Sequence, residues 1–185
     1  MCSSDLTNAS PPTTSTAASQ YPAEQYSACP TAVMGLTYNW TSMTSLVSNM
    51  SPNGSTNQNI GLQLGWMSLV GGGPFTVPAM DANYTYQQVI ILLTDGLNTQ
   101  DRWYGDGSNT STQVDARQQL TCTNIKAANI VLYTIQVNTD GGATSTLLRN
   151  CATDSSKFFL LTSASQIVTT FAQIGTNLSK LHIAK

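Results

Sequence analysis

The sequence predicts an α/β fold in which a doubly wound parallel sheet carries helices on both faces. Val89–Leu93 and Ile130–Val137 are runs rich in β-branched residues and leucine. This pattern is typical of strands that are buried on both sides. Helical segments alternate with these runs, and alternation of this kind favours parallel pairing within one sheet.

Two further segments complete the predicted sheet. Ala32–Thr37 is a short apolar strand candidate, and Phe158–Leu161 is expected to be the last strand. Helices are expected at residues 40–50, 59–69 and 112–128, with a fourth at the C-terminus. Ser163 and Gln166 match a capping box at the start of that fourth helix. Apolar residues then repeat on one helix face: Ile167, Phe171, Ile174, Leu178 and Leu181.

The composition indicates one folded domain with an uncharged polar surface. Charged residues make up 9% of the 185 residues, whereas 73 residues are Ser, Thr, Asn or Gln. A hydrophobic share of 41% is enough for a core. The net charge of -2 leaves no basic patch, so nucleic acids and anionic membrane surfaces are not expected partners. No apolar run is long enough to cross a membrane.

The first 25 residues are expected to lie outside the folded part. Residues 1–6 resemble a foreign start, and residues 7–20 are rich in Ser, Thr, Pro and Ala. We expect this segment to be disordered, because it has little apolar surface to offset the entropy of ordering. Residues 26–185 are expected to form the domain.

The strongest motif is a carboxylate at the end of a buried strand, in Thr94-Asp95-Gly96. In open parallel sheets, ligands bind beyond the carboxyl ends of the strands. Residues 53–59 form a small polar loop that places Thr56 just before a helix. A hydroxyl and a carboxylate are ligands that Mg²⁺ accepts. The alternatives are an ordinary turn at Asp95 and a helix N-cap at Thr56.

These residues resemble a von Willebrand factor type A domain, which has a Rossmann-like fold. The metal-ion-dependent adhesion site (MIDAS) of that family combines a D-x-S-x-S loop, a Thr and the Asp of T-D-G. The resemblance assigns the second and third elements to Thr56 and Asp95. It implies a binding edge at the neighbouring residues: Ser55, Asn57, Thr94 and Gly96. No D-x-S-x-S follows a strand, so the first strands of the domain are expected to lie upstream of this chain.

Further blocks are similar, in order, to TadG-like proteins of the bacterial tight-adherence (Flp) pilus system: residues 57–62, 122–126, 133–135, 148–152 and 171–181. The resemblance implies a non-enzymatic protein-binding or adhesion module of a Tad-type pilus-assembly protein. Its partners would be pilus-assembly components or surface ligands. Its location would be extracytoplasmic, with the parent protein anchored in the inner membrane. The intact parent would bind Mg²⁺ or Mn²⁺, and this fragment none.

Two other functions remain open. The first is a hydrolase-type enzyme on a doubly wound sheet, although the chain has neither a G-x-S-x-G elbow nor a phosphate-binding loop. The second is a structural domain whose metal site has decayed. Upstream sequence discriminates the enzyme from the binding module, and a metal-binding assay on the parent discriminates the decayed site.

The remaining polar and sulfur-containing residues carry narrower expectations. Asp101, Asp106 and Asp115 are expected to be solvated, and the D-x-S-x-T pattern at Asp106 is expected to be coincidental. With the extracytoplasmic placement that the resemblance implies, helices flanking neighbouring strands bring Cys122 and Cys151 within disulfide reach. The alternative is two buried free thiols. Cys29 is expected to be unpaired, and His182 to be a surface residue.

Overall fold

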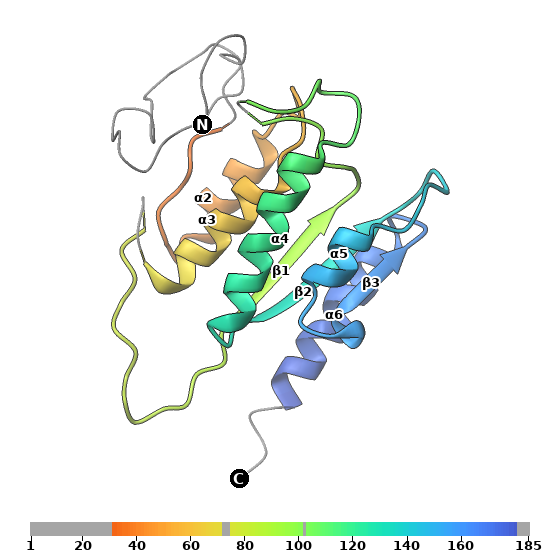
Figure 1. Cartoon of the computed structure of the whole chain (residues 1–185). Helices are drawn as coiled ribbons and strands as arrows, with labels where there is room; N and C mark the ends of the chain where they lie inside the picture. Colours follow the sequence, from red (N-terminus) through yellow and green to blue (C-terminus); the bar gives the residue numbers. More distant parts are fainter. Residues whose placement is uncertain (1–30, 72–74, 102, 181–185) are drawn as a thin grey trace, which may run out of the picture. The chain divides into compact units, whose positions relative to one another are not determined.

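The computed structural model describes residues 31–71, 75–101 and 103–180 (Figure 1). The expectations for the first 25 residues, Cys29 and His182 fall outside these ranges. The chain divides into two compact units. The helical unit comprises the described residues up to Tyr86 together with Leu97–Gln118, and the sheet unit comprises Gln87–Gly96 and the described residues from Gln119 onward.

The helical unit contains α2 (Trp40–Ser48), α3 (Gln58–Val70) and the first part of α4 (Thr112–Ala127). Asn39 caps α2 because its side-chain oxygen accepts a hydrogen bond from the Ser42 amide at 2.9 Å. Gly71 ends α3 with a φ of 87°, a conformation that favours glycine. All three helices lie within two residues of the predicted bounds.

The predicted strand at Ala32–Thr37 is wrong. The described residues from Thr31 to Asn39 contain neither strand nor helix. Val33 and Leu36 are about half exposed, at 50% and 52%. A short apolar run becomes a strand only when its backbone groups pair with a neighbouring strand, and this segment pairs with none of the described strands.

The sheet unit is built on three parallel strands in the order β1 (Val89–Thr94), β2 (Val131–Val137) and β3 (Phe158–Leu161). Leu93 of β1 is the register partner of Ile135 in β2, and Ile135 in turn is the partner of Phe159 in β3. The predicted parallel pairing of the last two strands is confirmed. The central strand β2 is almost entirely buried, as its apolar sequence predicts.

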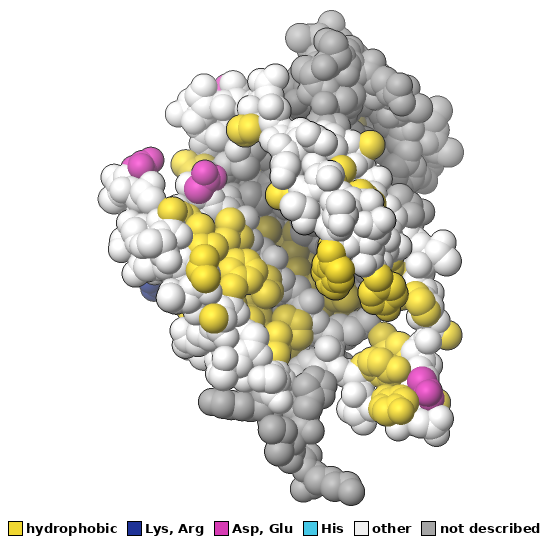
Figure 2. Space-filling view, turned by 180° about the vertical axis from the view of Figure 1, so that it is seen from behind, with side chains coloured by type: hydrophobic (Ala, Val, Ile, Leu, Met, Phe, Trp, Pro, Cys, Tyr) yellow, Lys and Arg dark blue, Asp and Glu magenta, His cyan; other side chains and the backbone are white. Residues whose placement is uncertain are grey.

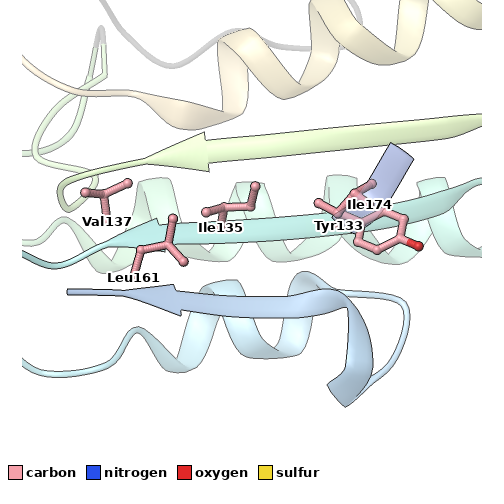
Figure 3. Close-up of a cluster of buried hydrophobic side chains, with 5 residues drawn as sticks. All are labelled: Tyr133, Ile135, Val137, Leu161 and Ile174. Atoms are coloured by element: carbon pink, nitrogen blue, oxygen red, sulfur yellow. The ribbon is translucent and has the colours of Figure 1, made fainter. Parts of the chain in front are cut away.

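Helices cover both faces of this sheet, which confirms the predicted fold class. Thr134 of β2 donates a hydrogen bond from its hydroxyl to the carbonyl of Leu148 in α5 (Thr146–Cys151) on one face. The opposite face packs against Ile174 of α6 (Gln166–Lys180). Figure 3 shows the buried cluster there, formed by Tyr133, Ile135, Val137, Leu161 and Ile174. A short 3-10 helix, η1 (Ser155–Lys157), precedes β3.

The start of α6 contains half of the predicted capping box. The side-chain oxygen of Gln166 accepts hydrogen bonds from the amides of Ser163, at 3.1 Å, and Thr162, at 2.8 Å. The Ser163 hydroxyl instead contacts the Ser165 hydroxyl at 2.9 Å. The glutamine therefore satisfies backbone donors ahead of the helix, as a capping box requires.

A disulfide joins α4 to α5 within the sheet unit. Cys122 and Cys151 are bonded, their Cα atoms lie 5.1 Å apart, and both residues are fully buried. The predicted bridge is confirmed, and the alternative of two free thiols is wrong. Disulfides persist in oxidising compartments, so the bridge fits a location outside the cytoplasm.

The surface agrees with the low charge of the sequence. Uncharged polar groups predominate on the face shown in Figure 2, where hydrophobic side chains form clusters and charged ones are sparse. None of the described helices combines the length and hydropathy that a membrane crossing requires.

Candidate functional site

Asp95 directly follows the buried strand β1 and is exposed. Thr94, the last strand residue, is buried, and its hydroxyl oxygen accepts a hydrogen bond from the Gly96 amide at 3.2 Å. This short bond turns the chain at the end of the strand. The Asp95 carboxylate is therefore available at the carboxyl end of a parallel strand, where ligands bind in such sheets.

Thr56 is held by its backbone while the residue remains exposed. Its amide donates to the Thr99 hydroxyl at 2.9 Å. Its carbonyl accepts from the amides of Thr99, at 2.9 Å, and Gln100, at 3.3 Å. Both backbone polar groups are thus satisfied from a loop more than 40 residues away, and the loop's hold on Thr56 leaves its hydroxyl unused.

The two neighbours of Thr56 are half-buried. The Ser55 hydroxyl donates to the side-chain oxygen of Gln100 at 2.7 Å. Asn57 stands at the N-cap position of α3 but makes no capping bond, and its side-chain oxygen is a buried acceptor without a hydrogen-bond partner. The simple N-cap alternative for Thr56 is therefore wrong, because Asn57 occupies the cap position.

Asn98 is a functional candidate that the sequence reasoning missed. Its side-chain oxygen accepts from the Gln58 amide at 2.8 Å, and its side-chain nitrogen donates to Asp115 at 2.8 Å and Gln118 at 2.7 Å. The residue is 1% exposed. Its position three residues after Asp95, in a loop without periodicity, was the available signal.

The binding-edge residues belong to different units. Ser55, Thr56 and Asn57 lie in the helical unit, and Thr94, Asp95 and Gly96 lie in the sheet unit. The structure places each group within its own unit. The convergence of Thr56 and Asp95 on one ion stays a prediction.

The expectation that Asp101 is solvated is wrong. The residue is 7% exposed, and its carboxylate lies 2.7 Å from the Arg117 guanidinium. It also accepts hydrogen bonds from the amides of Trp103 and Tyr104, each at 2.7 Å. The guanidinium lies over both aromatic rings, 5.4 and 5.2 Å from their centroids. Pairing with arginine is what permits an acidic side chain to be buried.

Asp106 is exposed, as expected, and its carboxylate stabilises its own turn. It accepts from the amides of Asn109 and Ser108 and from the Asn109 side chain. These bonds, led by the Asn109 amide, lower the pKa of Asp106 from 3.8 to about 2. The D-x-S-x-T pattern is therefore satisfied by a turn. Asp115 lies in the first turn of α4 and is half-buried, in contrast to the expected solvation.

The described residues offer limited support for a metal ion. A threonine hydroxyl and an aspartate carboxylate suit a hard cation such as Mg²⁺, which prefers oxygen ligands. The described part of the chain contains no group of three or more His, Cys, Asp or Glu that could hold a metal. Thr56 and Asp95 fit two positions of an octahedral shell and leave the others to water or to ligands from elsewhere.

The chain matches no protein-family model. It also matches no curated protein. Similar solved structures include proximal thread matrix protein 1 from the mussel byssus, with 18% identity and a TM-score of 0.47 over 72% of this chain. A second structure of that protein, with a zinc-occupied MIDAS motif, has 19% identity and a TM-score of 0.49 over 76% of this chain. The match spans less than a third of those proteins, 28% and 30% respectively.

Proposed function

We propose that this chain is the C-terminal part of a von Willebrand type A-like domain that binds partner proteins through its loop edge. The observation that carries the proposal is the arrangement of Thr56, whose backbone is fixed by Thr99 and Gln100 while the residue stays exposed. A polar group presented by a rigid loop pays little ordering entropy when it meets a ligand. Such an arrangement suits recognition and needs no nucleophile or general base.

The chemical contribution of the two proposed ligands follows from their side chains. Thr56 would provide a neutral hydroxyl oxygen and Asp95 a charged carboxylate oxygen to Mg²⁺ or Mn²⁺ in the longer parent. A cation that keeps open positions binds an oxygen of a partner and thereby links the two proteins. In this chain the two oxygens are a weak start, because Mg²⁺ gives up its waters reluctantly.

We further propose that the parent is a TadG-like component of a bacterial Tad-type pilus-assembly system, anchored in the inner membrane. Its partners would be other assembly components or surface ligands outside the cytoplasm. The ordered sequence blocks support this placement. The buried Cys122–Cys151 disulfide also supports it, since such bonds persist in oxidising compartments.

Calorimetry with Mg²⁺ and Mn²⁺ tests the metal part of the proposal. We expect negligible heat with this chain and measurable binding by a parent that includes the upstream strands. In the parent, binding should be lost in Asp95→Asn and in Thr56→Val, which keep the size of each side chain and change its oxygen ligand. Asp140→Asn is the matched control, because Asp140 is an exposed carboxylate that follows the neighbouring strand β2.

The other outcomes discriminate the alternatives. A parent that binds no metal would identify Asp95 as an ordinary turn residue and favour a structural domain with a decayed site. Tight binding by this chain would require other ligands, and Asp106 is then the candidate because Asp101 is paired with Arg117. Metal binding that survives both substitutions would overturn the assignment of Thr56 and Asp95.

A further inference from the structure

The Asn98 side chain makes a set of bonds that few other residues can reproduce. It presents an acceptor to the Gln58 amide and, at the same time, a donor group to Asp115 and Gln118. Aspartate of the same size has no donor for those two acceptors, and glutamine is longer by one methylene. An amide buried to 99% with all three bonds made stabilises one arrangement of the segments that it joins.

These bonds connect the two ends of the segment that presents Thr56. Gln58 is the first residue of α3, two positions after Thr56, and Asp115 and Gln118 lie in the first half of α4. The Gln118 side-chain nitrogen also donates to the Gln58 side-chain oxygen at 3.1 Å. Asn98 therefore ties the start of α3 to α4, so the loop before α3 has a fixed end.

The two residues after Asn98 complete the hold. Thr99 bonds the amide and the carbonyl of Thr56, and Gln100 bonds the Thr56 carbonyl and the Ser55 hydroxyl. Three consecutive residues thus contact four consecutive residues of the other loop, apart from Asn57. The only exposed residue among Ser55–Gln58 is Thr56.

We infer that Asn98 and Thr99 are positioning residues that set the Thr56 hydroxyl in one orientation before any ligand binds. The purpose of this positioning rests on the proposed binding function, but the positioning itself does not. In this view the residues that follow T-D-G have a second task. Asp95 is presented by the strand end, and Asn98 and Thr99 present a hydroxyl from a distant loop.

Amide hydrogen exchange and methyl relaxation, measured by NMR on this chain without metal or partner, test the inference. In Thr99→Val the acceptor for the Thr56 amide is lost, and we expect about tenfold faster exchange at Thr56. The order parameter of the Thr56 methyl group should fall. Thr99→Ser keeps the hydroxyl and should restore both values. Exchange at Ile135, in the central strand, should stay unchanged in both variants.

Asn98→Asp provides the second variant. We expect faster exchange at the amides of Thr56, Gln58 and Gln100, with Asn124→Asp, an exposed site on α4, as the charge-matched control. Unchanged Thr56 exchange in Thr99→Val, or no restoration by Thr99→Ser, would overturn the inference. Because no metal is present, these results are independent of the calorimetry: a positioned Thr56 in a parent that binds no metal would refute the proposed function alone.

Discussion

Lys126 of α4 donates hydrogen bonds from its ammonium group to the carbonyl of Asn150, at 2.6 Å, and of Ala152, at 3.4 Å, at the end of α5. These carbonyls have no partner within the helix, and a cation is favourable near them. The contact lies next to the Cys122–Cys151 disulfide in both helices. Two different interactions therefore hold α4 and α5 together in the sheet unit.

Removal of the disulfide should lower stability substantially. For a loop closed over 29 residues, the chain-entropy model gives about 3–4 kcal/mol of the free energy of unfolding. We expect a decrease of this order in the Cys122→Ala/Cys151→Ala double variant, measured by urea denaturation. The two single variants are the controls and should lose as much as the double variant. A double variant that is as stable as the parent chain would contradict the assignment.

The ion pair between Asp101 and Arg117 should contribute measurably because the carboxylate is buried. Asp101→Asn keeps an oxygen for the amides of Trp103 and Tyr104 but removes the charge that faces Arg117. Arg117 is partly exposed, so we expect a loss of about 1–2 kcal/mol in urea denaturation. Asp140→Asn, at an exposed site, should change stability little. Equal stabilities of the two variants would refute an energetic role for the pair.

Gly105 should tolerate no side chain. Its φ is 97°, and a Cβ there would collide with the Thr99 carbonyl oxygen and lie 2.8 Å from the Gln100 Cα. We expect Gly105→Ala to cost at least about 2 kcal/mol more than Gly141→Ala, which shares a positive φ of 72° but meets open space. Thermal denaturation of both variants measures the difference. The same cost at both sites would mean that the loop moves to accept the methyl group.

The Asp106 carboxylate should remain ionised in mild acid. Its pKa is lowered from 3.8 to about 2, so its bonds stabilise the folded turn above pH 4. This contribution is lost as the pH falls through about 2. We expect an NMR titration to give a midpoint near 2, and Asn109→Ala to raise it toward 3.8. The pKa of Asp154, lowered chiefly by the Ser156 hydroxyl, is the internal control and should not respond to that substitution.

The elements that sequence analysis predicted correctly are those with a strong local pattern. The runs at β1, β2 and β3 are apolar over their whole length, and α6 repeats its apolar residues on one face. Ala32–Thr37 has a weaker version of the same pattern and forms no strand. Local pattern was sufficient where it coincided with a neighbouring strand to pair with, and misleading where no such strand exists among the described elements.

The sequence by itself determined the parallel α/β class, the exposed Asp95 after a buried strand and the pairing of Cys122 with Cys151. Tertiary structure decided the burial of Asp101 and the hold of Asn98, Thr99 and Gln100 on the loop of Thr56. The physical reason is distance along the chain. Apolar periodicity is written into consecutive residues, whereas a buried polar side chain depends on partners that only folding brings within hydrogen-bond range.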